Sequence, residues 1–76
     1  MKNEYKLNKI ISVNNLNVEL IDITYDEESN PTFVVFNEVI FDRRKKHKAK
    51  IKYNRLGPHF IFESNFIYLH DFIEEE

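Results

Sequence analysis

Hydrophobic and polar residues alternate along much of this chain with a period of two. The alternation is unbroken in "KHKAKIKY", residues 46–53. A period of two is typical of a strand with one buried face, whereas a helix would scatter these lysines around its circumference. We therefore predict one strand here, with one exposed and one buried set of side chains. The exposed set is Lys46, Lys48, Lys50 and Lys52, and the set facing the core is His47, Ala49, Ile51 and Tyr53, packed with Phe33, Phe36, Phe60 and Phe62.

Residues 16–25, "LNVELIDITY", also alternate, but the phase changes in the middle of the segment. Leu16 and Leu20 share one face, whereas Ile21 and Ile23 share the opposite one. A slip of one residue moves every following side chain to the other face of a sheet. The pattern therefore predicts a β-bulge at Leu20–Ile21, or a strand that bends from one sheet into another.

The remaining segments predict further strands and a short helical turn. Residues 32–41, apolar except at Asn37 and Glu38, indicate a central strand covered on both sides, either continuous or interrupted at those two residues. Residues 59–62 and 66–69 indicate two short strands, and Asn-rich or Pro-containing turns are expected at 14–15, 26–31, 54–58 and 64–65. Residues 5–13 fit a first strand or a short helix, and residues 69–73 fit one helical turn.

Five or six strands at this spacing predict a mainly β fold: a small antiparallel barrel or sandwich, with an SH3-like barrel as first choice. The alternative is an α+β arrangement with one curved antiparallel sheet and a terminal helix. The 76 residues leave room for one domain, 1–76. A chain of this size buries only about 60% of its unfolded surface, so we expect a dense core, for which seven Phe, four Tyr and nine Ile supply large apolar side chains.

Composition narrows the class of protein. The chain has no Cys, so disulfides and thiolate metal sites are excluded. No apolar run approaches the ~20 residues that span a bilayer, and no signal peptide is recognisable, so we expect a cytoplasmic protein without membrane contact. Lys, Asn, Ile, Phe and Tyr make up about half of the chain. These are residues of AT-rich codons, and they suggest a low-GC bacterium or one of its phages.

Charge is strongly segregated. Residues 43–55 hold eight of the eleven Lys and Arg residues and no acid. Such a segment indicates a charged partner, either phosphate groups or an acidic protein surface, although lysines along an edge strand also serve simply to prevent edge pairing. The lysine face carries no aromatic of its own strand on which a base could stack. The candidate binding residues are Arg43, Arg44, Lys45, Lys46, Lys48, Lys50, Lys52 and Arg55, with a secondary acidic patch at Asp26, Glu27, Glu28, Glu74, Glu75 and Glu76.

Signals of catalysis or metal binding are weak. His47, His59 and His70 lack a metal-ligand spacing; we expect His47 to point inward and His59 to flank a turn. Ser12, Ser29 and Ser64 lack the surroundings of a nucleophile. We therefore expect no enzyme, no cofactor and no metal.

The sequence predicts a small interaction protein, encoded by a phage or mobile element, that binds and inhibits or modulates a host protein or nucleoprotein complex. The alternative is a nucleic-acid-binding module that uses the basic segment 43–55 to contact the phosphates of DNA or RNA.

Overall fold

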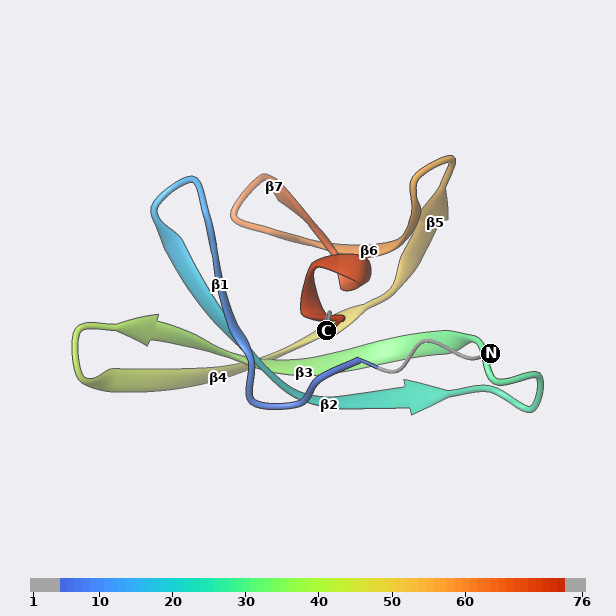
Figure 1. The fold of residues 1–76 in the computed structure, drawn as a ribbon, viewed down its shortest axis with the longest axis horizontal. Coiled ribbons are helices and arrows are strands. Elements are labelled where there is room, and N and C mark those ends of the chain that lie inside the picture. The colour runs from blue at the N-terminus through green and yellow to red at the C-terminus, as the bar shows by residue number, and fades with distance from the viewer. Residues whose placement is uncertain (1–4, 74–76) are drawn as a thin grey trace.

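The computed structural model describes residues 5–73, which form two antiparallel sheets. The first sheet holds β1 (Ile10–Val13), β2 (Leu16–Tyr25), β3 (Pro31–Ile40) and β4 (Arg43–Lys50). The second holds β5 (Lys52–Asn54), β6 (Gly57–Phe62) and β7 (Asn65–Tyr68), and the 3-10 helix η1 (Leu69–Phe72) follows. Both sheets keep their strands in chain order, and η1 lies between them (Figure 1).

The mainly β, antiparallel class is thus confirmed, but residues 5–73 form seven strands rather than five or six, and the sheets do not close into a barrel. The alternative of a single curved sheet is wrong, since the strands divide into a four-stranded and a three-stranded sheet. The SH3-like arrangement stays a prediction.

The predicted bulge in β2 is confirmed. Leu20 pairs with Phe36 and Asp22 pairs with Val35, so Ile21 is the extra residue. Because the bulge restores the phase, Leu20 and Ile23 both reach the buried face of the sheet although they are three positions apart.

Two-residue turns with positive φ connect several strands. Asn14 (φ 49°) and Asn15 (φ 71°) join β1 to β2, as the sequence predicts. Glu63 and Ser64, also at positive φ, join β6 to β7, one residue earlier than expected. The prediction that Phe41 ends the central strand is wrong: β3 runs without interruption through Asn37 and Glu38 but ends at Ile40.

The predicted strand 46–53 is divided at Ile51. β4 ends at Lys50, and Lys52 begins β5, where it pairs with His59 of the second sheet. Ile51 is only 4% exposed, and its N–H donates to the Thr32 carbonyl (2.8 Å). One buried residue therefore carries the chain from one sheet to the other, and Lys52 leaves the face of the other three lysines.

Two residues predicted to face the core are exposed instead. Tyr53 is 54% exposed, with its hydroxyl donating to the Pro31 carbonyl, and Phe33 is 39% exposed. Phe33 pairs with Lys50 and therefore lies on the outer face of the first sheet. Ala49 and Phe62 are partly buried and pack against the core, as predicted. The fully enclosed core comprises Val18, Leu20, Ile23, Val34, Phe36, Ile51, Phe60, Ile67, Leu69 and Phe72.

The two ends of the described chain lie together. A β-bridge joins Tyr5 to Ile73, and the Lys6 N–H donates to the Phe72 carbonyl (2.7 Å). The predicted helical turn is confirmed as η1, whereas the N-terminal segment is a strand only over Ile10–Val13 and not a helix. No helix within residues 5–73 has the length and apolar character needed to cross a membrane.

Candidate functional site

The eight predicted basic residues lie on three different surfaces. Lys46, Lys48 and Lys50 pair with Asn37, Val35 and Phe33 of β3, all on the sheet face that points away from the core; we call these three lysines the lysine row. Arg44 lies on the same face, at one end of the row. Arg43 and Lys45 lie on the opposite face of β4, while Lys52 and Arg55 belong to the second sheet and its first turn.

An aromatic side chain lies beside the lysine row, contrary to the expectation from β4 alone. The ammonium of Lys48 is 5.2 Å from the centroid of the Phe33 ring, which comes from the neighbouring strand β3. A cation within about 6 Å of a ring centroid is attracted to the ring face. The outer face therefore combines fixed positive charge with a partly exposed ring.

The Arg44 end of this face is neutralised within the chain. Arg44 Nε donates to Glu19 Oε1 (2.8 Å), and Asn37 Nδ2 donates to the same oxygen (3.2 Å). The hydrogen bonds from Arg44 and then Asn37 hold the pKa of Glu19 below its usual value. Lys46 and Lys50, by contrast, form no ion pair with any residue in the range 5–73. The charge available to a partner is thus that of the row, not that of Arg44.

The tip of the β3–β4 hairpin projects from the body of the molecule (Figure 1) and carries two exposed apolar side chains beside the charged Asp42 and Arg43. Phe41 is 96% exposed, and its φ of 55° is one that L-residues with large side chains rarely adopt. Ile40 beside it is 45% exposed. A shallow groove of about 380 Å³ separates this tip from the β1–β2 turn; it is lined by Asn15, Leu16, Asn17, Glu38, Val39, Ile40 and Phe41.

The described part of the acidic patch lies far from this tip. Asp26, Glu27 and Glu28 belong to the β2–β3 loop, which is at the opposite end of β3 from Phe41 (Figure 1). Asp26 Oδ1 accepts the N–H groups of Glu28 and Asn30 (2.9 Å each), and the bond from Asn30 is the main reason that the pKa of Asp26 is lowered. Asp26 therefore holds the loop together. Glu74, Glu75 and Glu76 lie outside the described residues.

His59 and His70 both pack against Tyr68 (5.2 and 5.4 Å between ring centroids), whereas His47 packs against a separate pair of rings, Phe36 and Phe62. His47 points inward as predicted, stacking on Phe36 (5.3 Å between ring centroids), whereas His59 is not at a turn but buried within β6. His70 stacks on Tyr68, on the other side of the second sheet's strands from the core. Within residues 5–73 no group of three His, Cys, Asp or Glu side chains could hold a metal ion.

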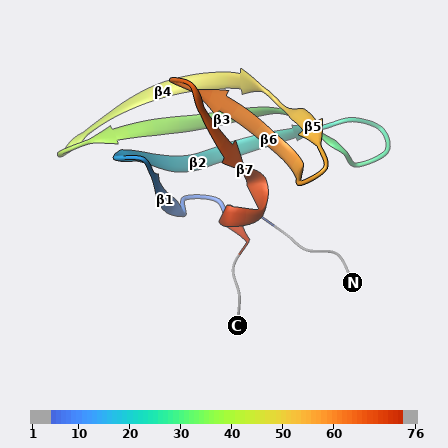
Figure 2. The same cartoon turned by 90° about the horizontal axis from the view of Figure 1, so that it is seen from above.

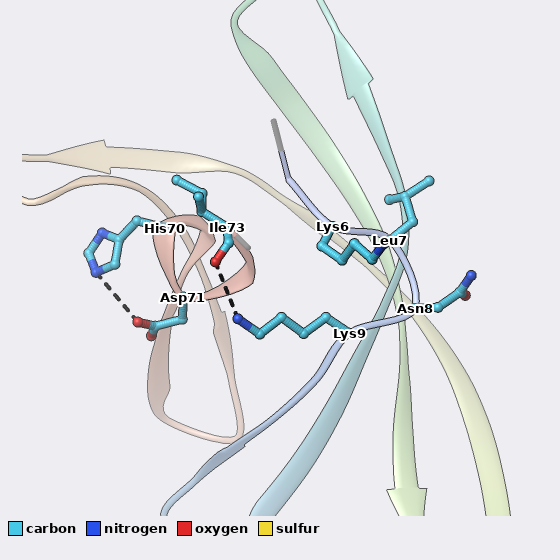
Figure 3. Close-up of a pocket in the computed structure, with 7 residues that line it drawn as sticks. All are labelled: Lys6, Leu7, Asn8, Lys9, His70, Asp71 and Ile73. Atoms are coloured by element: carbon cyan, nitrogen blue, oxygen red, sulfur yellow. Dashed lines mark hydrogen bonds and ion pairs between the residues drawn. The ribbon is translucent and has the colours of Figure 1, made fainter. Parts of the chain in front are cut away.

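A cavity of about 800 Å³ forms an open hollow between the segment 6–9 and η1. Figure 3 shows Lys9 reaching across it, where its ammonium donates to the Ile73 carbonyl (3.3 Å), and His70 beside Asp71 (3.6 Å). Leu7 and Asn8 point away from the helix (Figure 3). None of its lining residues within the described range is a Ser, Thr or Cys, so these residues offer no hydroxyl or thiol nucleophile.

Comparisons with known proteins add no assignment: no family model matches the chain, and neither curated proteins nor solved structures give a significant match.

Proposed function

We propose that this chain is a non-enzymatic interaction protein that binds an acidic region of another protein through the β3–β4 hairpin. The observation that carries the proposal is the exposure of Phe41 at the tip of that hairpin, next to a basic strand. Large aromatic side chains and arginines dominate the energetics of protein interfaces, because they fill pockets from which water is excluded.

The conformation of Phe41 supports the same proposal. A side chain that is 96% exposed gains no burial in the free protein, yet its positive φ costs about 1–2 kcal/mol for an L-residue. Strained residues of this kind are found mostly at functional sites, and burial of the Phe41 ring by a partner would offset the cost of its backbone conformation. Ile40 and the groove beside the tip would extend the contact around such an anchor.

Charge sets the kind of partner. Arg43 follows directly after the tip, and the lysine row lies further along β4, so an acidic rim around the receiving pocket would be drawn to this hairpin. The inhibitory role against a host protein, and the phage origin, remain part of the proposal: a bound hairpin would block whichever basic ligand the acidic region normally receives.

The test is affinity capture on immobilised chain, from a nuclease-treated lysate of a low-GC bacterium. Phe41→Ser should lose the captured protein, because removing a central anchor costs about 2 kcal/mol or more, roughly a 30-fold loss of affinity. Leu56→Ser is the matched control, since Leu56 is also exposed (64%) but lies in a turn of the second sheet. Capture of the same proteins by all three chains would refute the role of the hairpin tip.

Nucleic acid is the second candidate, and Phe33 favours it. Its ring lies beneath the ammonium of Lys48 in the lysine row. Proteins that bind single-stranded nucleic acids combine an aromatic ring, on which a base stacks, with nearby positive charge. Gel shifts with oligonucleotides at about 50 and 200 mM salt test this, because binding through phosphates weakens steeply over that range. The absence of any shift at the lower salt concentration would remove this candidate.

A further inference from the structure

β4 is a long strand at the open edge of its sheet. The order of the first sheet is β1-β2-β3-β4, so β4 has a partner on one side only, and Figure 2 shows it along the rim of the molecule. β1, β5 and β7, the other edge strands among the described residues, have four, three and four residues, whereas β4 has eight. Short edges are a common protection against unwanted pairing, and β4 lacks it.

The hydrogen-bond register shows which backbone groups of β4 are open. The Ile51 N–H donates to the Thr32 carbonyl, and in an antiparallel pair such bonded positions alternate with unbonded ones. Ala49, His47 and the alternate residues before them therefore bond to β3. The N–H and C=O groups of Lys46, Lys48 and Lys50 point the other way, and within residues 5–73 no backbone bond outside the strands uses them.

The lysine row thus presents both its charges and its free backbone groups along the same edge. In an added antiparallel strand, the residues directly opposite Lys46, Lys48 and Lys50 would exchange backbone hydrogen bonds with them and place their side chains on the same face. Opposite charges in such positions attract, and like charges repel.

We infer that the acidic partner binds by strand addition: an extended segment with acidic residues at alternate positions pairs with the edge of β4. The inference rests on the proposed function and specifies its partner. Each acidic residue would meet one lysine at the ~6.6 Å repeat of a strand, while the main chain supplies affinity independent of sequence.

The same lysines exclude a second copy of this chain. Two β4 edges pairing with one another would bring the rows of both copies onto facing strands, where the like charges repel. The β4 edge therefore does not pair with the β4 edge of a second copy, but it can pair with a strand of opposite charge. The lysines thus give specificity in two ways, by attracting an acidic strand and by repelling a second basic one.

The direct test uses a peptide of four Glu-Thr repeats and NMR-detected amide exchange. The expected result is slower exchange at the amides of Lys46, Lys48 and Lys50, with little change at His47 and Ala49, which already bond to β3. Two control peptides separate charge from pairing. One has the same composition with its glutamates contiguous; the other is methylated on the backbone nitrogens of its glutamates, and both should lose most of the protection.

Charge reversal in the protein provides the matched variants. Lys48→Glu with Lys50→Glu should abolish the protection by the peptide. Lys52→Glu with Arg55→Glu, an equal change of charge on the second sheet, should leave it intact. Circular dichroism on both double variants establishes that the fold is kept.

Three results would overturn the inference. Equal binding of the methylated peptide would mean charge attraction without strand pairing. No response to any acidic peptide would mean that an acidic strand does not bind this edge. The proposed function would not be affected, because it is tested independently by the capture experiment with Phe41→Ser. Protection of the same amides by an oligothymidylate, without any by the peptides, would assign the edge to nucleic acid.

Discussion

Replacing Phe41 by glycine should stabilise the free protein and weaken its binding to a partner. Phe41 has φ 55°, and Asp42 after it does not share the positive φ, so the turn has its left-handed residue in the first central position. Glycine is the preferred residue there in two-residue hairpins with that arrangement. An L-residue at positive φ costs about 1–2 kcal/mol, whereas glycine costs about 0.5–1 kcal/mol in lost chain entropy.

The net gain should be about 0.5 kcal/mol, because a ring that is 96% exposed loses almost no burial when it is removed. For a domain of this size that corresponds to a rise of roughly 2–4 °C in melting temperature. Thermal unfolding followed by circular dichroism measures it. Phe66→Gly provides the contrast: Phe66 is half exposed but lies in β7 at ordinary φ, so glycine should lower the melting temperature.

A Phe41→Gly protein that melts several degrees below the wild type would refute this reasoning. It would mean that the ring packs into the neighbouring groove and contributes to the fold rather than to a partner. A Phe41→Gly protein that captures the same proteins as the wild type would leave the stability argument intact and remove the functional one.

Three further predictions concern stability, each measured by urea unfolding. Ile51→Ala should cost about 2–5 kcal/mol because Ile51 is 4% exposed, whereas Lys48→Ala should stay within about 0.5 kcal/mol; equal effects would contradict the assigned faces. Glu19→Gln should cost about 0.2–1 kcal/mol at pH 7. Because the pKa of Glu19 is lowered in the folded state, this contribution is complete above its unfolded pKa and disappears as pH falls through the folded value; a pH-independent difference would contradict it. Tyr53→Phe should cost about 0.5–1.5 kcal/mol by removing the hydrogen bond to Pro31; no change would mean that water replaces the bond fully.

Local patterns in the sequence were sufficient to predict several elements of the fold. The phase change in residues 16–25 locates the bulge at Ile21, because side-chain direction in a strand depends only on position parity. Asn14 and Asn15 predict a tight turn because asparagine tolerates positive φ better than most other non-glycine residues. The spacing of Leu69 and Phe72 likewise predicts a helical turn whose two apolar residues are buried.

Features that depend on how strands pair with one another could not be predicted from these local patterns. The alternation in 46–53 continues through Ile51 unchanged, so it gives no sign that the chain passes there into a second sheet. Phe33 joins the lysine row only through its register with Lys50, which a single strand cannot reveal. The position of Phe41 in a turn could have been predicted, since extending the β4 strand back to Arg43 leaves only residues 41–42 to connect it to β3. The apolar side chain of Phe41 instead suggested that the central strand continued through it.

The connection of each strand to its sequence neighbour has a consequence for how the chain folds. All the strand pairs of the described chain join consecutive segments through short links, so each hairpin closes a small loop at little entropic cost. The long-range steps are the docking of the second sheet and η1 onto the first, and the meeting of Tyr5 with Ile73. Folding rates fall as the sequence separation of contacts grows. The rate-limiting step should therefore be this docking around Ile51, with the β3–β4 hairpin already formed when it occurs.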